Sequence, residues 1–255
     1  MISAGAQIGR LHRGATGVTP HYRGGVTPAA VASTSPADVE SAGAGDAEVR
    51  PSWRGRMHTW SFAAVIPAGI ALIVAASGAA ATAAVSIYVA SLLLAFGTSA
   101  SYHRLARSPR ARAVMRRLDH STIYLLIAGT YVPMCIIVLP PAWGIPVLSV
   151  VVAGAVLGVA LKLAAFHRAQ WLGYALYPVL GWAAVAAAPA MATHATPAQI
   201  ALVVGGGLAY TIGMPVLLLR RPDPWPRTFG YHEVWHGFTV VAAALHFAAV
   251  ATAVA

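Results

Sequence analysis

Charged residues are scarce in this chain of 255 residues, of which Asp, Glu, Lys and Arg together make up only 9%. Soluble domains usually carry about 25% charged residues. In place of charge, the chain has a hydrophobic content of 58%. A composition of this kind excludes an ordinary soluble domain and indicates an integral membrane protein.

Cysteine and acidic residues are also few. Cys135 is the single cysteine, so no disulfide can form within the chain, and nothing in the sequence points to an oxidising environment. The chain has 7 acidic residues and 17 Lys and Arg, which gives a formal net charge of +10. A basic balance can signal a nucleic-acid partner. The positions of the basic residues along the chain, described below, argue against one.

The first fifty residues lack the long apolar runs of the remainder. They are rich in Gly, Ala, Thr, Ser and Pro, and they contain no apolar stretch like the core of a signal peptide. Such a segment cannot bury enough apolar surface to offset the entropy lost on ordering. We therefore predict a disordered cytoplasmic tail over residues 1–52 and a membrane domain over residues 53–255.

Seven apolar runs follow the tail, and each is close to the 20 residues that a helix needs to cross the hydrocarbon core. Pro and Gly occur in several of them, which transmembrane helices tolerate when neighbouring groups satisfy the freed carbonyls. The runs cover residues 60–78, 83–103, 119–139, 145–166, 171–190, 198–219 and 230–252. The sequence predicts an all-α fold, a bundle of seven transmembrane helices.

The basic residues of this region collect on alternate connections. They precede the first run, lie between the second and third, flank the connection from the fourth to the fifth, and lie between the sixth and seventh. The other connections contain none. Because Lys and Arg near spans remain in the cytoplasm, this pattern predicts a cytoplasmic N-terminus and an external C-terminus in a multi-pass protein of the cell membrane. Topology and contact with anionic lipid headgroups explain the basic excess without a nucleic acid.

Polar side chains gather at one predicted depth of this bundle, the cytoplasmic ends of three spans. His232 and His236 stand four residues apart, so both imidazoles project from one face of a helix. His103 ends the second predicted span, and Asp119 begins the third. Such residues inside spans usually face the bundle interior and serve a function. We predict that His103, His232 and His236 bind zinc and leave a fourth position open, as in catalytic zinc sites.

Two further residues complete the predicted site. Ser99 lies one turn before His103 on the same helix face, and Asp119 is placed to position a water or to act as a base. Both are therefore predicted to be catalytic. Alternatives remain for several residues: Asp119 as the N-cap of its helix, His103 as an interfacial residue, and iron or manganese in place of zinc.

Six further histidines are predicted to lie outside the metal site. His120 points about 100° away from Asp119 around the helix, and His246 is about 15 Å from His236 along the axis. We regard the four others as incidental, namely His12, His21, His167 and His194.

Three motifs together resemble the hemolysin III family, the bacterial branch of a wider group that includes the adiponectin and progestin receptors. They are Ser99-x-x-x-His103, the stretch from Leu118 to Pro133, and His232-x-x-x-His236. The resemblance covers roughly residues 54–252. It implies a seven-helix bundle with zinc near the cytoplasmic side, held by the three matching histidines, with Ser99 and Asp119 at the remaining polar positions. The polar stretch from Arg54 to His58 also resembles the residues before the first span in relatives.

Three functions compete at this point. The resemblance implies a zinc-dependent hydrolase of a lipid amide, related to alkaline ceramidases and linked to membrane homeostasis. The segment His232-Glu233-x-x-His236 also matches the metalloprotease signature, in which Glu233 would be the general base. The non-enzymatic alternative is a membrane-homeostasis factor, sensor or haemolysin-like pore with a structural zinc. Nothing in the spans resembles a selectivity filter, which disfavours a channel. The sequence does not predict an oligomeric state.

Overall fold

A computed structural model describes residues 50–168 and 170–254 of the chain. The predicted disordered tail, residues 1–52, falls almost entirely outside the described residues. Within the described ranges the structure is helical, and its only β-type pairing is an isolated bridge between Trp225 and Phe229.

Seven helical segments of the described chain are long and apolar enough to cross a membrane. Two of them contain a change of helix type: α4 continues into the π-helix η1, and the fifth segment consists of α6, the 3₁₀-helix η2 and α7. The elements are α2 (Arg56–Ala75), α3 (Ala79–Leu105), α4 (Pro109–Pro133), η1 (Met134–Val138), α5 (Pro141–Ala164), α6 (Gln170–Gly181), η2 (Trp182–Ala187), α7 (Ala188–His194), α8 (Pro197–Leu219) and α9 (Tyr231–Val254). The predicted all-α fold with seven spans is therefore confirmed.

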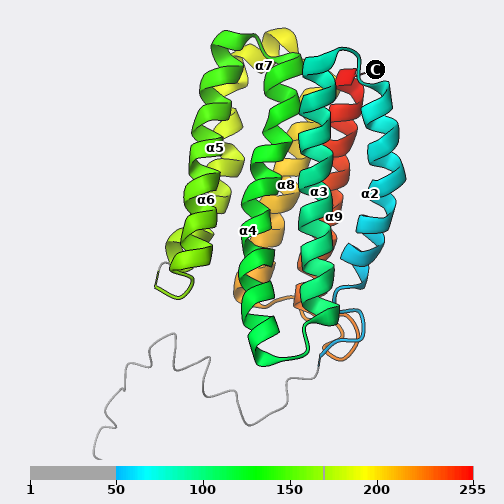
Figure 1. The fold of residues 1–255 in the computed structure, drawn as a ribbon, viewed down its shortest axis with the longest axis vertical. Coiled ribbons are helices and arrows are strands. Elements are labelled where there is room, and N and C mark those ends of the chain that lie inside the picture. Colours follow the sequence, from blue (N-terminus) through cyan, green and yellow to red (C-terminus); the bar gives the residue numbers. More distant parts are fainter. Residues whose placement is uncertain (1–49, 169, 255) are drawn as a thin grey trace, which may run out of the picture. The chain divides into compact units, whose positions relative to one another are not determined.

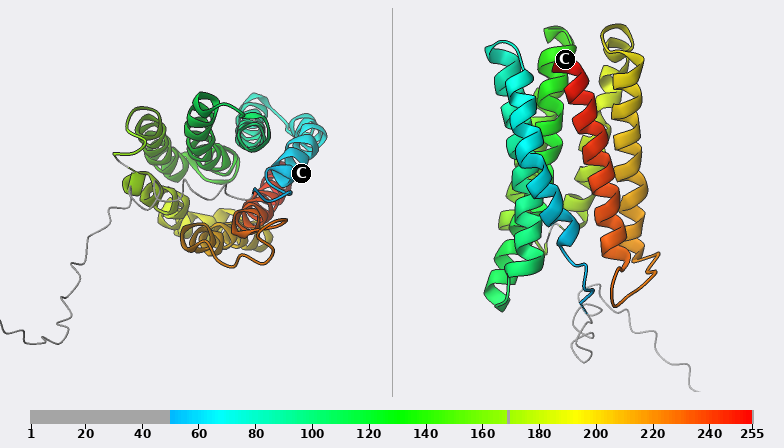
Figure 2. Two further views of the ribbon diagram at one scale, coloured as in Figure 1. Left: turned by 90° about the horizontal axis from the view of Figure 1, so that it is seen from below. Right: turned by 90° about the vertical axis from the view of Figure 1, so that its right-hand side faces the viewer.

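The spans run up and down and follow one another around a ring (Figures 1 and 2). Each span packs against the next in the chain, and α9 closes the ring by packing against α2. The last helix also contacts α3 and α4. This closure brings together helices from the beginning and the end of the membrane domain.

The basic residues gather at one end of the bundle. The described arginines and Lys162 all lie in or beside the segment before α2 and the connections α3–α4, α5–α6 and α8–α9. These connections lie together at the lower end of Figure 1, whereas the C-terminal end of α9 lies at the upper end. We call the lower end the arginine-rich end. The charge asymmetry matches the predicted alternation, and placing this end in the cytoplasm remains a prediction.

The predicted start of the third span was wrong by ten residues. α4 begins at Pro109 rather than at residue 119, and its N-cap is Ser108, whose hydroxyl accepts a hydrogen bond from the Ala111 N–H at 3.1 Å. Arginine and alanine are good helix formers, so the helix continues past the apolar stretch that defines the span. Asp119 consequently lies well inside α4, and the alternative that it caps this helix is incorrect.

A hydrophobic core holds α2, α3 and α9 together. Its buried side chains include Leu72 on α2, Tyr88 and Leu92 on α3, and Ala243 and Val250 on α9. Burial of large apolar groups between these helices fixes α3 against α9. The same two helices carry the three histidines of the predicted metal site.

Gly129 marks a close approach between α4 and α3. A Cβ atom at this position would overlap the Ser91 hydroxyl, which itself donates to the Tyr88 carbonyl at 2.7 Å. We expect Gly129→Ala to destabilise the folded bundle by about 1–3 kcal/mol, because overpacking forces side chains and backbone to shift. Thermal unfolding of the purified protein in detergent measures this effect.

Gly207 on α8 provides the control for this substitution. A Cβ there meets no atom within 4 Å, so Gly207→Ala should leave stability unchanged or raise it by up to about 1 kcal/mol. Equal melting temperatures for the two variants would contradict the close contact between α3 and α4.

Candidate metal centre

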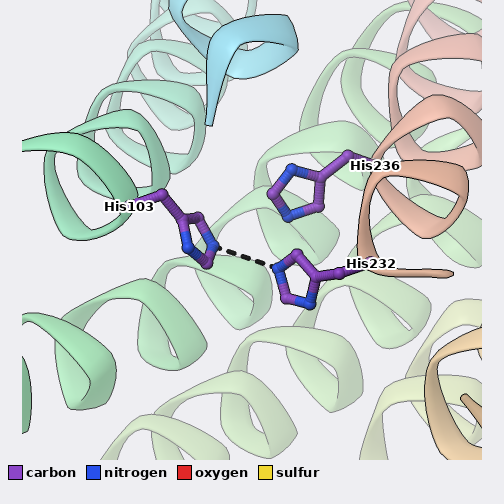
Figure 3. A group of neighbouring side chains, drawn as sticks. All are labelled: His103, His232 and His236. Carbon is purple, nitrogen blue, oxygen red and sulfur yellow. Dashed lines mark hydrogen bonds between the residues drawn. The ribbon is translucent and has the colours of Figure 1, made fainter. Parts of the chain in front are cut away.

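Three histidines converge near the arginine-rich end of the bundle (Figure 3). His103 comes from the last turn of α3, and His232 and His236 come from successive turns at the start of α9. One ring nitrogen from each residue lies within 4.8 Å of the other two. The Nε2 atoms of His103 and His232 are 3.1 Å apart. The structure thus brings together the three residues predicted to bind a metal.

The donor set fits a divalent transition metal such as zinc. Nitrogens that share a zinc ion at about 2.1 Å are about 3.4 Å from one another, so small ring rotations suffice to close this group around an ion. The Nδ1 atom of His236 is buried and has no hydrogen-bond partner among the described residues. A buried imidazole nitrogen without a partner suits a metal better than it suits the surrounding hydrocarbon.

Asp119 and Ser99 lie beside the three histidines. The Oδ2 atom of Asp119 on α4 is 4.0 Å from Nε2 of His103, a separation too long for a direct hydrogen bond. The Ser99 hydroxyl, one turn before His103 on α3, is buried and interacts with the Asp119 carboxyl. A carboxyl and a hydroxyl therefore adjoin the histidine cluster, on the α3 and α4 side of it.

His58 is a neighbour of this cluster to which sequence reasoning assigned no role. Its buried ring on α2 stacks on the His236 ring, with centroids 3.9 Å apart and planes 10° from parallel. His58 Nε2 and Thr239 Oγ1 are 3.1 Å apart, and the Thr239 hydroxyl donates to the His236 carbonyl at 2.8 Å. The stacking of His58 on His236 orients the His236 ring. The only signal in the sequence was the polar stretch from Arg54 to His58.

Glu233 lies next to His232 in the sequence but is engaged elsewhere. Its side chain is fully buried, with Oε1 2.7 Å from Nε of Arg54 and Oε2 accepting the Gly230 N–H at 3.0 Å. One oxygen holds the segment before α2, and the other holds the start of α9. The general base that the metalloprotease reading requires is thus committed to an ion pair.

Hydrogen bonds hold the segment before α2 against the ends of the two helices that carry the histidines. Ser52 and Trp53 donate backbone hydrogen bonds to the carbonyls of Arg227 and Thr228, both at 3.1 Å, in the connection between α8 and α9. On the other side, the Arg50 guanidinium donates to the His103 carbonyl. Residues 50–55, which we call the pre-α2 segment, therefore link the end of α3 to the start of α9.

Gly55 permits the pre-α2 segment to pass close to His103. Its φ of +78° is in the left-handed region that favours glycine, and a Cβ there would lie 2.7 Å from the His103 Cβ. Any other residue would be strained and would also push the segment away from α3. Glycine at this position therefore helps to enclose the histidine cluster.

Two other histidines of the described chain have partners outside this cluster. The His120 ring packs against Phe166 and Tyr174, with centroid separations of 5.4 and 5.9 Å. His246 Nε2 is 3.1 Å from the Val203 carbonyl. His12 and His21 lie outside the described residues.

Two cavities in the described part of the chain differ in their distance from the three histidines. An apolar cavity of about 260 Å³ lies between η1, the fifth span, α8 and α9, with His246 and Ala249 in its lining. Ten residues of helix separate His246 from His236, which is about 15 Å. A smaller hollow of about 220 Å³ has His103 in its wall. The larger cavity therefore belongs to the opposite half of the bundle.

Comparisons with known proteins agree with this architecture. Residues 47–247 match the family model described as haemolysin-III related. The chain is 31% identical over 185 residues to the Hemolysin-3 protein of Bacillus cereus, an alignment that covers 71% of this chain and 81% of the relative. It is 30% identical over 162 residues to a Hemolysin-3 homolog of Bacillus subtilis strain 168, with coverage of 64% and 73%. The chain belongs to the haemolysin III family of multi-pass membrane proteins.

Proposed function

We propose that the protein is a zinc-dependent hydrolase that cleaves a lipid amide near the cytoplasmic face of the membrane. The observation that carries this proposal is the convergence of three imidazoles, one carboxyl and one hydroxyl from α3, α4 and α9. Clustered polar groups in an otherwise apolar bundle are expensive to maintain and usually mark a functional site. The histidines support a metal, and the carboxyl beside them supports a reaction.

The chemistry divides between the metal and the chain. Zinc held by His103, His232 and His236 would act as a Lewis acid toward a water and the substrate carbonyl. Asp119 is placed to accept a proton at Oδ2 and to deliver it to the nitrogen of the leaving amine. The Ser99 hydroxyl contacts the Asp119 carboxyl and holds it in orientation. The stack of His58 on His236 keeps one ligand ring fixed.

A lipid substrate suits the position of the site. The histidines lie at the ends of spans, beside the arginine-rich connections, where the acyl region of a bilayer meets its headgroups. The amide bond of a sphingolipid or an N-acyl lipid lies at this boundary. Lateral entry from the bilayer would then bring the scissile bond to the level of Asp119.

We expect Asp119→Asn to reduce amide hydrolysis by about 10²–10⁴-fold while the protein retains its metal, because the amide cannot accept the proton. Ser99→Ala should have a smaller effect in the same direction. Hydrolysis of fluorescent ceramides and N-acyl lipids by purified protein, measured together with metal content, tests both variants.

Matched controls lie in the same part of the chain. Asp223→Asn changes a carboxylate in the α8–α9 connection that accepts the Tyr231 N–H, and Ser121→Ala removes a hydroxyl that donates to the Arg117 carbonyl. Neither should change turnover. Full activity of a metal-loaded Asp119→Asn variant would contradict the assigned role, and a metal-loaded wild type without activity on any lipid amide would exclude the hydrolase proposal.

A structural metal is the second candidate, because the three histidines come from two helices, α3 and α9, that are far apart in the sequence. An ion shared by α3 and α9 would clamp the ring in a protein that serves as a sensor or membrane-homeostasis factor. The distance of the larger cavity from the histidines favours this alternative. A haemolytic pore, which the names of the Bacillus relatives suggest, is disfavoured because the described basic residues gather at one end and form no charged path across the bundle.

A further inference from the structure

A hollow of about 220 Å³ lies at the arginine-rich end, beside the histidine cluster. Among the described residues, four arginines and one of the three histidines contribute to its wall, and no carboxylate does. The lining residues are Arg50, Pro51, Ser52, Arg54, Arg56, His103 and Arg104. Its composition distinguishes it from the apolar cavity in the other half of the bundle.

The hollow is a built feature of the fold. One wall is the pre-α2 segment, held by the backbone hydrogen bonds of Ser52 and Trp53 to the α8–α9 connection. The Arg50 guanidinium fixes the same segment to the His103 carbonyl, and Gly55 allows the close approach to α3. The arginines are therefore presented by backbone with a defined position rather than by a loose loop.

Most of the positive charge around the hollow is not balanced within the described chain. Glu233 pairs with Arg54 at 2.7 Å. Among the described residues no ion pair involves Arg50, Arg56 or Arg104, and the side chains of all three are exposed. Three arginines whose charge is not paired among the described residues thus line a space large enough for a small anion.

We propose that this hollow binds a phosphate group beside His103. Guanidinium groups donate paired hydrogen bonds in a planar fork that matches phosphate oxygens, and several of them around one hollow favour phosphate over a carboxylate, which has only two oxygens. The phosphate is either the headgroup of a lipid or a free phosphate ion from the aqueous phase.

In the lipid case the hollow defines the substrate class, an inference that rests on the proposed function. A phosphate held by Arg56 and Arg104 would place the adjoining part of the lipid at His103 and Asp119. The substrate of the hydrolase is then an amide-containing lipid with a phosphate headgroup. A neutral ceramide would leave the arginines without a partner.

Binding to the full chain in neutral detergent tests the proposal, after metal removal so that turnover does not intervene. Three probes are titrated by calorimetry: inorganic phosphate, a short-chain phosphatidylglycerol, and a short-chain diacylglycerol that lacks phosphate. We expect saturable binding of a phosphate-bearing probe and none of diacylglycerol. Saturation by inorganic phosphate identifies the free ion as a ligand, and saturation by phosphatidylglycerol alone identifies the headgroup.

The double variant Arg56→Gln/Arg104→Gln should weaken this binding at least about tenfold, because charge-assisted hydrogen bonds are lost. Its matched control is Arg107→Gln/Arg110→Gln, which removes the same charge from exposed residues at the same end of the bundle that do not line the hollow. The control should remain within twofold of wild type. Equal affinity in the two double variants, or binding without preference for phosphate, overturns the proposal.

Hydrolysis assays on the same proteins separate this inference from the proposed function. Phosphate binding without hydrolysis of any lipid amide would retain the phosphate site and reject the hydrolase. Hydrolysis of lipid amides without phosphate binding would retain the hydrolase and reject the phosphate site. Efficient cleavage of a phosphate-bearing lipid amide that falls selectively in Arg56→Gln/Arg104→Gln supports both.

Discussion

Alanine in place of His236 is expected to remove the bound metal, from about one ion per chain in the wild type to a small fraction of that. The substitution leaves only His103 and His232 as imidazole ligands and also removes the ring against which His58 stacks. Elemental analysis of protein purified without added metal gives the stoichiometry and identifies the ion. Activity on lipid amides should disappear together with the metal.

The control for this variant is His246→Ala, which changes another buried histidine of α9. That residue contacts the Val203 carbonyl and lies ten residues beyond His236. Its substitution should leave the metal in place. Wild-type metal content in the His236→Ala variant would show that the three histidines do not form the site, and the hydrolase and structural-metal proposals would both fail.

The second large effect is expected from Glu233→Ala. The substitution leaves the Arg54 guanidinium without its carboxylate and removes the acceptor of the Gly230 N–H. Arg54 is partly exposed, so the loss should lie near the lower end of the range for broken buried ion pairs, about 3 kcal/mol. We expect the melting temperature in detergent to fall by roughly 6–12 °C.

Glu233→Gln separates the stabilising role of this residue from a catalytic one. The amide retains an acceptor for the Gly230 N–H but has no charge for Arg54, so stability should fall less than in the alanine variant. Metal content should be unchanged, and lipid-amide hydrolysis should fall only modestly. Loss of nearly all activity in a stable, metal-loaded Glu233→Gln protein would instead support the metalloprotease reading.

Much of the fold could be predicted because the bilayer constrains it strongly. A crossing helix needs about 20 apolar residues, and basic residues accumulate on alternate connections. Those two rules identified all seven spans. Helix ends were less predictable, since hydropathy reports the apolar stretch and not the helix. The first turns of α4 are rich in arginine, so hydropathy did not show that this helix begins at Pro109.

The candidate site was predictable where helical periodicity or membrane depth could be read. His232 and His236 share a face by their spacing, and His103 and Asp119 were placed at the same depth by topology. The position of His58 beside the site could not be predicted, because its partner Thr239 lies 181 residues away in the sequence. Two other features could not be predicted, because each joins residues that are distant in the sequence. They are the ion pair of Arg54 with Glu233 and the hollow beside His103.

The separation of the histidines along the chain determines when the site can form. His103 and His232 are 129 residues apart, and the second lies on the final helix. During synthesis, six spans must enter the membrane before the last two imidazoles become available. A bound ion would therefore indicate that all seven spans have assembled. Fragments that lack α9 should contain no ion.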